Sequence, residues 1–256
     1  MKYKYYLKSD IGIVRKQNQD SGFAYTASVP TGQAFFGGVC DGMGGMADGE
    51  IASGYVAARL HNWFSECFPA ISVCQELGAE LFRQWGELIN ECSGAIAEMG
   101  QSNNAPSGTT LSLLLIFNGR FYAAQIGDSR IYSCSDGGFV QVTKDHSYVH
   151  DMVDKGLMTD DEAVSSTQRN ILTRCIGYTD NVQADYYTGI VKKGDWFLAS
   201  SDGFHGGTEP AGLFSLLGEK NKITAQKLRA KVRAAIERRK SQGERDNITA
   251  LAVVVS

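Results

Sequence analysis

The sequence predicts a layered α+β fold, because stretches with strand character and stretches with helical periodicity occur in separate blocks. Short apolar segments bounded by turn residues form the start, the middle and the end of the chain. Two segments with apolar residues at helical spacing separate the first two blocks, and a third precedes the final strand. Such a separation of strands and helices is typical of α+β domains.

The first block is predicted to contain three strands followed by two helices. The strands are expected over 2–8, 21–27 and 33–40, and the third should end at the Asp41-Gly42 turn. Apolar residues at helical spacing predict one helix over 50–66 and a longer one from Leu77 to Met99. Gly86 and Gly94 weaken the second helix prediction.

The middle block is predicted to be antiparallel. Strands are expected over 109–117, 120–126, 130–134 and 139–142, with turn signals at Asn118-Gly119 and at 136–138. Consecutive tight hairpins indicate one antiparallel sheet. A polar, weakly helical stretch over 147–169 is predicted to be a surface insertion. A strand over 195–201, a helix over 225–240 and a last strand over 248–255 complete the expected elements.

Length and composition predict one domain. The 256 residues can bury a full core, and the chain has only four prolines and no repeat or low-complexity linker. We therefore expect a single domain over 1–256 with a flap-like insertion at about 147–170. The net charge of −3 argues against nucleic acid or anionic membrane as partners. With no apolar run near ~20 residues and no signal peptide pattern, a cytoplasmic protein is expected.

The cysteines and histidines do not predict a metal or redox site. None of the six cysteines forms a C-x-x-C pair, and most have apolar neighbours, which is typical of buried free thiols. The four histidines are scattered, whereas structural zinc needs clustered cysteine and histidine ligands.

Five acidic turns at strand ends carry the predicted chemistry. A carboxylate beside an apolar strand is costly unless it is paired or binds a cation, although a single Asp-Gly sequence is usually only a turn. Together, five such turns favour a site for hard cations such as Mg²⁺ or Mn²⁺. Two such ions can share a water, acidify it and orient it for attack on phosphorus. The turns are RKQNQD at 15–20, DGMGG at 41–45, GDSR at 127–130, SSDG at 200–203 and RDN at 245–247.

Two residues in these turns have further predicted roles. The guanidinium of Arg15 could hold phosphate oxygens bidentately, although an isolated arginine is more often a surface residue. The glycine after Asp41 would let a backbone carbonyl approach an ion.

The motifs, in their order along the chain, resemble the metal-dependent protein phosphatase family, type 2C, in its bacterial form. Besides the acidic turns, the resemblance includes SGTT at 107–110, T-x-DHS at 143–147 and RNxLTRxIG at 169–177. It implies a four-layer sandwich of two antiparallel sheets, with helices on both outer faces. It also implies a Mn²⁺ or Mg²⁺ pair, with a weaker third ion, and phosphorylated proteins as substrates, the targets of a serine/threonine kinase.

The resemblance assigns roles residue by residue. Asp41 would bridge both metals, and the carbonyl of Gly42 would bind the second. Asp202 and Asp246 would bind the first metal. The remaining assignments are Asp20, which supports the second metal through water; Asp128, which helps a third, weaker site; Arg15, which binds the substrate phosphate; and residues 147–169, which match the flap. The implied reaction is direct attack of a metal-bridging water on phosphoserine or phosphothreonine, without a phosphoenzyme.

Three places depart from the bacterial family pattern, whereas Met43, which replaces a histidine of animal relatives, is usual in bacterial members. Gln19 stands where glutamate is common, which should weaken metal affinity modestly. Gly206 replaces an aspartate that would support the third metal. His205 beside it is interpreted as a rim residue, with a role as ligand or proton donor as the alternative. Ser166-Thr167-Gln168 replaces a frequent His-Pro pair, so flap contacts should differ.

Three alternative functions were weighed. Residues 42–47 fit a G-x-G-x-x-A dinucleotide turn, but Asp41 would repel the pyrophosphate and the neighbouring strands look antiparallel. A phosphoprotein-binding module without catalysis is favoured by Gln19 and Gly206 but disfavoured by the intact metal aspartates. Ten Lys and Arg residues between Lys220 and Arg245 suggest nucleic-acid binding, yet the interleaved apolar face favours a solvated helix.

Overall fold

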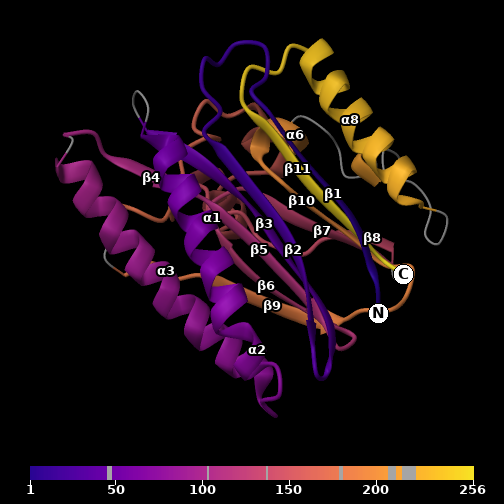
Figure 1. Cartoon of the computed structure of the whole chain (residues 1–256). Helices are drawn as coiled ribbons and strands as arrows, with labels where there is room; N and C mark the ends of the chain where they lie inside the picture. Colours follow the sequence, from indigo (N-terminus) through magenta and orange to yellow (C-terminus); the bar gives the residue numbers. More distant parts are fainter. Residues whose placement is uncertain (45–47, 103, 137, 179–180, 207–211, 215–222) are drawn as a thin grey trace.

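Two antiparallel sheets pack face to face, with helices on the outer face of each sheet. The computed structural model describes residues 1–44, 48–102, 104–136, 138–178, 181–206, 212–214 and 223–256. Helices α1 (Gly49–Glu66) and α3 (Leu77–Ser102) cover one sheet, and α8 (Ala225–Ser241) covers the other (Figure 1). This arrangement confirms the expected four-layer sandwich. The two chain ends lie side by side, where the Lys2 amide donates to the Ser256 carbonyl at 2.9 Å.

The first sheet has the strand order β2-β3-β5-β6-β9, and β4 pairs with the end of β3. The Asn118-Gly119 turn joins β5 to β6, as predicted. The edge strand β9 was not predicted, because its exposed and half-buried residues lack a clear apolar pattern. The strands are β2 (Asp20–Val29), β3 (Gly32–Gly44), β4 (Ser107–Thr109), β5 (Leu111–Phe117), β6 (Arg120–Ile126) and β9 (Asp185–Ile190).

The second sheet has the order β1-β11-β10-β7-β8, which corrects the prediction of a single middle sheet. The chain turns after β6 but crosses to the opposite sheet, so β6 and β7 do not pair. The strands are β1 (Tyr3–Asp10), β7 (Arg130–Ser135), β8 (Gly138–Gln141), β10 (Trp196–Ser200) and β11 (Ile248–Val255). The predicted turn residue Gly137 lies outside the described residues.

Several boundaries also differ from the sequence prediction. Strand β3 does not end at the Asp41-Gly42 turn but continues to Gly44, because β4 pairs with Gly42, Met43 and Gly44. The stretch predicted as one strand over 109–117 is divided into β4 and β5. Two short helices were not predicted, α2 (Phe68–Ile71) and α6 (Asp202–His205).

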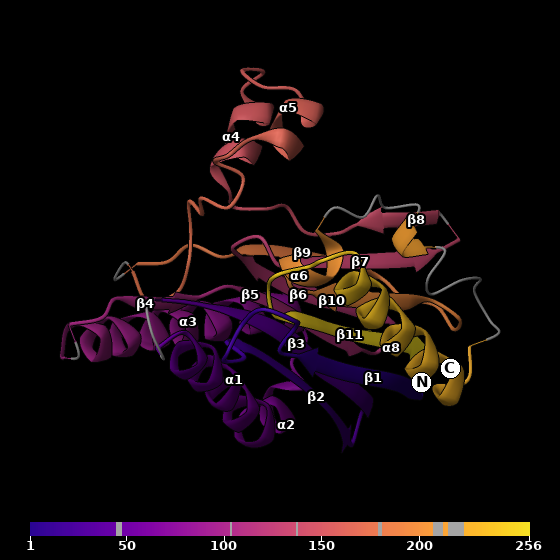
Figure 2. The ribbon, with the colours of Figure 1, turned by 90° about the horizontal axis from the view of Figure 1, so that it is seen from above.

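The insertion contains two short helices, α4 (Tyr148–Asp154) and α5 (Asp160–Ser165). Figure 2 shows this segment standing out from the sandwich. Its helices begin at Ser147 and Thr159, whose hydroxyl oxygens accept from the amides of His150 and Glu162. At Thr159 the Glu162 side chain accepts in return from the cap amide, which completes a capping box. Local capping therefore supports helices that bury little apolar surface.

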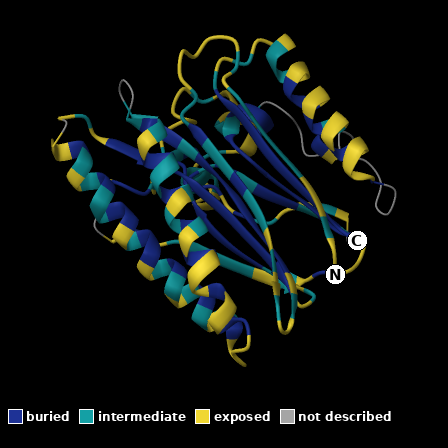
Figure 3. Cartoon of the chain, viewed as in Figure 1, coloured by how far each residue is buried: buried dark blue, intermediate teal, exposed yellow. Residues whose placement is uncertain are grey.

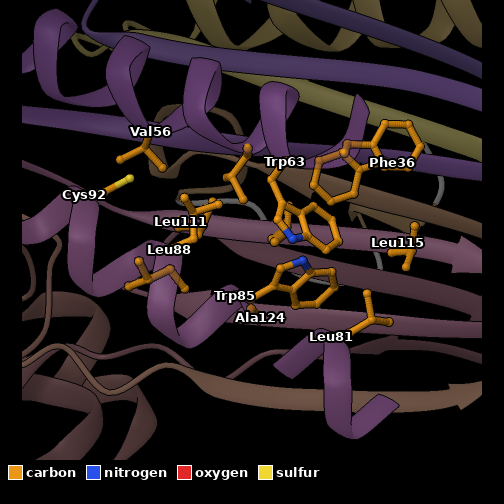
Figure 4. Close-up of a cluster of buried hydrophobic side chains, with 14 of the residues drawn as sticks. Phe36, Val56, Trp63, Leu81, Trp85, Leu88, Cys92, Leu111, Leu115 and Ala124 are labelled. Carbon is orange, nitrogen blue, oxygen red and sulfur yellow. The ribbon is translucent and has the colours of Figure 1, made fainter. Parts of the chain in front are cut away.

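Central strands such as β5 and β11 are buried on both faces, whereas edge strands such as β8 and β9 are partly exposed, and the outer helices expose one face to solvent (Figure 3). The largest apolar cluster joins the first sheet to α1, α2 and α3, and a second joins the other sheet to α8. A third cluster fills the space between the sheets. In the first cluster, the rings of Trp63 and Trp85 meet edge to face at 5.8 Å beside Phe36 (Figure 4).

The helix α8 buries the residues that its sequence predicted: Leu228, Val232, Ala235 and Ile236. Among the basic residues of that region, Lys220 and Lys222 lie outside the described residues. In the described part of the chain, no helix is both long and apolar enough to cross a membrane.

Candidate active site

A cavity of about 710 Å³ collects the predicted site residues. The loops that precede β2 and β11 lie at the same end of the sandwich (Figure 1). The chain therefore brings residues from both sheets to one place. Six predicted site residues line the cavity: Arg15, Asp41, Gly42, Asp128, Asp202 and Asp246.

Asp20, the seventh predicted residue, lies beneath these residues in the protein interior. It begins β2, lies opposite Asp41 in the register of β2 and β3, and is 7% exposed. One carboxylate oxygen, Oδ2, accepts from Ser201 Oγ at 2.8 Å. The other, Oδ1, is buried without a hydrogen-bond partner among the described residues. A buried oxygen in this state is ready to accept from a water or to face a cation.

The backbone at Asp41 and Gly42 is held on both sides. The Asp41 amide donates to Thr110 Oγ1 at 2.9 Å, and the Asp41 carbonyl accepts from the Thr110 amide at 2.9 Å. A Cβ at Gly42 would lie 2.2 Å from the Gly49 carbonyl oxygen, so only glycine lets the start of α1 approach this strand. The carboxylate of Asp41 is thus carried by a part of β3 whose backbone is held on both sides.

Asp128 and Asp202 reach the cavity from the second sheet. Asp128 lies in the connection from β6 to β7, where the chain crosses between the sheets. Asp202 begins α6 directly after β10, and its Oδ1 is buried without a hydrogen-bond partner among the described residues. The sheet crossing that the sequence did not predict is what carries Asp128 to the other carboxylates.

Arg15 and Asp246 form an ion pair, with 2.7 Å between Arg15 Nη2 and Asp246 Oδ2. Asn247 positions the loop that carries Arg15, because its side-chain amide donates to the Ile11 and Gln17 carbonyls at 3.0 Å. Its Oδ1 accepts from the Gln19 amide at 2.8 Å. The sequence analysis did not assign this role to Asn247, although the residue stands in the RDN motif.

Burial and mutual repulsion raise the pKa values of four carboxyls at the site, those of Asp20, Asp41, Asp128 and Asp202. Burial is the main cause in each case. It raises the pKa of Asp20 to about 7 and that of Asp128 to about 8. The pKa of Asp41 is also raised, with added repulsion from Asp20 and Asp202, and that of Asp202 rises through burial and the charge of Asp246. These pKa shifts measure how poorly the folded chain alone tolerates the negative charges.

The carboxylates fit hard divalent cations. Oxygen donors with surplus negative charge and unpartnered buried atoms suit Mg²⁺ or Mn²⁺. Among the described residues, no group of three or more acidic, histidine or cysteine side chains is arranged so that it could by itself hold one metal ion. Water and backbone oxygen would therefore have to complete the coordination, as is usual for Mg²⁺, which keeps several of its waters.

Cys40 and His205 lie beside these residues but are enclosed. Cys40 is fully buried under α1, and burial raises the pKa of its thiol, so a reactive thiolate is disfavoured. His205 is 4% exposed and its Nδ1 lies 3.1 Å from Ser200 Oγ. His205 is thus buried, because the α6 turn directs it inward, and it lines a second cavity beside the insertion. Burial lowers the pKa of His205, which favours the neutral ring.

Gly206 accompanies His205 along this second cavity of about 1030 Å³ beside the insertion. Its amide donates to the Asp202 carbonyl at 2.6 Å. The neighbouring Gly207 lies outside the described residues, as do residues 45–47 of the dinucleotide-like pattern. Strand β3 pairs only with antiparallel strands, which argues against that alternative.

Comparison with known proteins agrees with this architecture. A family model described as protein phosphatase 2C matches residues 14–238. The protein phosphatase PhpP of Streptococcus pneumoniae is 33% identical over 199 residues, which cover 77% of each chain. The solved S. agalactiae serine/threonine phosphatase has a TM-score of 0.87 and 30% identity over 100% of both chains. The catalytic domain of serine/threonine protein phosphatase PstP, solved with two manganese ions, has a TM-score of 0.79 and 28% identity over 99% of both.

Proposed function

The chain belongs to the protein phosphatase 2C family of metal-dependent serine/threonine phosphatases, and we propose that its clustered aspartates bind two divalent metal ions for hydrolysis of protein phosphoserine and phosphothreonine. The observation that carries this proposal is the convergence of four carboxylates on one cavity beside Arg15. The manganese pair in PstP supports the choice of ion. Mg²⁺ is the alternative, because it prefers the same oxygen ligands.

The proposed ligands are those that the family resemblance assigns, and all of them except Asp20 line the cavity. Asp41 would contact both ions, and the Gly42 carbonyl would contact the second. Asp202 and Asp246 would bind the first ion. Asp20 would act through water, because it lies beneath the cavity and keeps one unpartnered oxygen. When bound, the ions would supply the positive charge that acidifies a water and orients it toward phosphorus.

A third, weaker ion would depend on Asp128. Family members often have a second aspartate three residues after the glycine of SDG. This chain has Gly206 at that position, so that position provides no carboxylate for a third ion. The raised pKa of Asp128 shows that the chain does not neutralise this group by itself. We therefore assign Asp128 to a site of lower affinity than the main pair.

Arg15 would bind the substrate phosphate. Its guanidinium now pairs with Asp246, and this pair is partly exposed, so exchanging the carboxylate for a phosphate should cost little. Engagement of Asp246 by an ion would release the guanidinium for bidentate contact with phosphate oxygens. Arg15 would in this way couple metal loading to substrate binding.

The two cysteines near the carboxylates do not favour a covalent phosphocysteine route. Cys40, next to Asp41, is enclosed by apolar side chains and has a raised pKa. Cys175 lines the cavity, but burial raises the pKa of its thiol to about 11. We therefore propose one in-line displacement, in which water attacks phosphorus while the bond from phosphorus to the serine or threonine oxygen breaks, and that oxygen leaves as the protonated hydroxyl. The carboxylates would hold the ions beside the phosphate. Substitution of Cys40 by serine should leave metal-dependent turnover in place.

The direct test is hydrolysis of p-nitrophenyl phosphate and of a phosphothreonine peptide by purified protein with Mn²⁺, with Mg²⁺ and with EDTA. We expect metal-dependent turnover that EDTA and Asp202→Asn abolish. Asp136→Asn is the matched control, because that carboxylate is 68% exposed and does not line the cavity. A folded protein without turnover in any metal would instead favour the phosphoprotein-binding alternative. We propose targets of a serine/threonine kinase as the physiological substrates.

A further inference from the structure

The catalytic cavity is larger than metal and phosphate binding require. Its 710 Å³ lies within the range of pockets that take ligands much larger than a phosphate group. One wall carries the aspartates and Arg15. A second part of the lining, called the wall below, comes from residues 170–178 and 181–183, which lie between the insertion and β9 and have no role in the proposed metal centre. Its cavity-lining residues include Asn170, Leu172, Tyr178, Asn181, Val182 and Gln183.

This wall is fixed to the body of the protein. The Gly177 amide donates to Ser93 Oγ at 2.9 Å, and the Val182 amide donates to Asn90 Oδ1 at 2.8 Å, so α3 holds it at two points. The backbones of Ile176 and Thr109 exchange two hydrogen bonds of 2.9 Å. A wall held in this way can contact a ligand without a large ordering cost.

Tyr178 is the most exposed apolar group on this wall. It is 53% exposed, yet its ring packs directly on the backbone of Gly108 in β4. A Cβ at Gly108 would lie 2.8 Å from Tyr178 Cδ2. Because Gly108 pairs with Met43 at the end of β3, the ring lies beside the strand end that carries Asp41. An exposed aromatic side chain in a fixed position is a common recognition element at binding sites.

The wall presents little free charge. Its cation, Arg174, is 2.8 Å from Asp185 Oδ1 and also donates to the Gln183 carbonyl at 3.3 Å. The ion pair carries no net charge, but both side chains are partly exposed, so the pair is weak and does not by itself exclude an acidic ligand group. What faces the cavity is mainly apolar surface, from Tyr178 and Leu172, and side-chain amides.

We propose that this wall is a peptide subsite that selects an uncharged, apolar or aromatic residue next to the phosphorylated residue of the substrate. Tyr178 and Leu172 would contact that side chain. The amides of Asn181 and Gln183 would hydrogen-bond the substrate backbone, which every peptide provides. This inference rests on the proposed phosphatase function and specifies its substrate class.

The test uses phosphothreonine peptides of one sequence, in which the residues flanking phosphothreonine are Phe, Leu, Ser, Asp or Lys. For the Mn²⁺-loaded enzyme, kcat/KM for each peptide is divided by kcat/KM for p-nitrophenyl phosphate. We expect Phe and Leu peptides to exceed Asp peptides by about ten-fold in this ratio. Equal ratios for all peptides, or a preference for Asp, would overturn the inference while p-nitrophenyl phosphate turnover upheld the phosphatase function.

Substitutions in the wall test whether the preference for apolar flanking residues arises there. Tyr178→Ala should lower the Phe-over-Asp preference by about five-fold, and Tyr178→Phe should keep it, because the ring makes the contact. Leu172→Ala reports on the same wall independently. Ile190→Ala is the matched control, since this apolar residue is 72% exposed on β9 and does not line the cavity. An unchanged Phe-over-Asp preference in both wall variants would refute the subsite. If the wild-type protein turned over none of the substrates, both the phosphatase proposal and this inference would be refuted.

Discussion

Asp145 and the aspartates of the candidate metal centre lie at neighbouring cavities, but the chain neutralises them to different degrees. Asp145 is 6% exposed and accepts from Arg130 Nε at 2.9 Å and Nη2 at 2.7 Å. Asp41 and Asp202 have no such arginine among the described residues, and their pKa values are raised. Asp145 is thus neutralised by the fold, whereas Asp41 and Asp202 depend on a cation from solution.

The difference indicates how acidic residues divide between structure and function. A bidentate arginine fixes a carboxylate and makes it part of the folded framework. Carboxylates without a cation weaken the fold, and selection for stability alone would not retain several of them in one place. These carboxylates lower the stability of the ion-free fold, and they gain a favourable interaction only when an ion binds. Substitutions in the two groups should therefore have opposite consequences.

The largest expected effect is on catalysis at the metal centre. Asp202→Asn and Asp41→Asn should each lower kcat by at least about 10³-fold, because each removes charge that holds the ions. In EDTA, neither variant should melt at a lower temperature than the wild type, since each removes repulsion. Kinetics with Mn²⁺ and thermal melts with EDTA test both parts. Near-native turnover in either variant would refute its assignment as a metal ligand.

The next largest effect is on stability, at the neutralised aspartate. Arg130→Ala leaves the buried carboxylate of Asp145 without its cation, so the free energy of unfolding should fall by roughly 3 kcal/mol. Arg130→Lys should recover only part of the loss, because lysine cannot donate two parallel hydrogen bonds. Urea unfolding measures both values. An unfolding free energy equal to that of the wild type would show that the ion pair does not stabilise the fold.

A smaller effect is expected from pH in the metal-free protein. The raised pKa values of about 7 for Asp20 and about 8 for Asp128 mean that the folded chain binds more protons than the unfolded chain above about pH 4. The free energy of unfolding should therefore fall as pH rises from about 4 to about 8. Urea unfolding in EDTA at several pH values measures the slope.

Two comparisons sharpen the pH experiment. Asp20→Asn should reduce the slope, because it removes one of the raised carboxyls. Mn²⁺ should also reduce it, since ion binding favours the deprotonated form. Stability that increases over this pH range in EDTA would contradict the view that these carboxyls lack a cation in the folded chain.

The smallest expected effect is at Arg15, whose pair with Asp246 is partly exposed. Arg15→Ala should raise KM by about ten-fold and lower kcat by less, because the guanidinium is proposed to bind phosphate rather than to react. Its melting temperature should change little, as for most exposed ion pairs. Arg15→Lys should give an intermediate KM. An unchanged KM in the alanine variant would remove Arg15 from the phosphate site.

Much of the fold could be predicted because its local patterns are strong. The helix around Trp63 and Leu60 has apolar residues at helical spacing, and the strand over 248–255 is buried at every position. The secondary-structure and sheet predictions failed where the contacts that decide the structure join residues far apart in the sequence. Strand β9 buries little surface, so its composition does not reveal it as a strand. Only its pairing with β6 in the folded protein does so. The turn after Ile126 resembles a hairpin, but the following strand pairs with β10 instead.

The candidate site shows the same division. Asp41, Asp202 and Asp246 could be selected from their positions at strand ends, since a carboxylate there needs compensation. The contact between Arg15 and Asp246 joins residues 231 positions apart, and no local pattern encodes such a distance. The positioning role of Asn247 was missed for the same reason, because its partners lie in the loop before β2.

The sequence by itself determined most strand and helix segments, the acidic turns and the residue types suited to hard cations, because these depend on neighbours along the chain. Only the tertiary structure decided that β6 and β7 enter different sheets, that Asp20 pairs with Asp41 across adjacent strands, and that Tyr178 and the aspartates line one cavity. These features depend on which distant surfaces pack together. The physical reason is that packing free energy is gained between segments far apart in the chain, while periodicity and turn chemistry report only local preference.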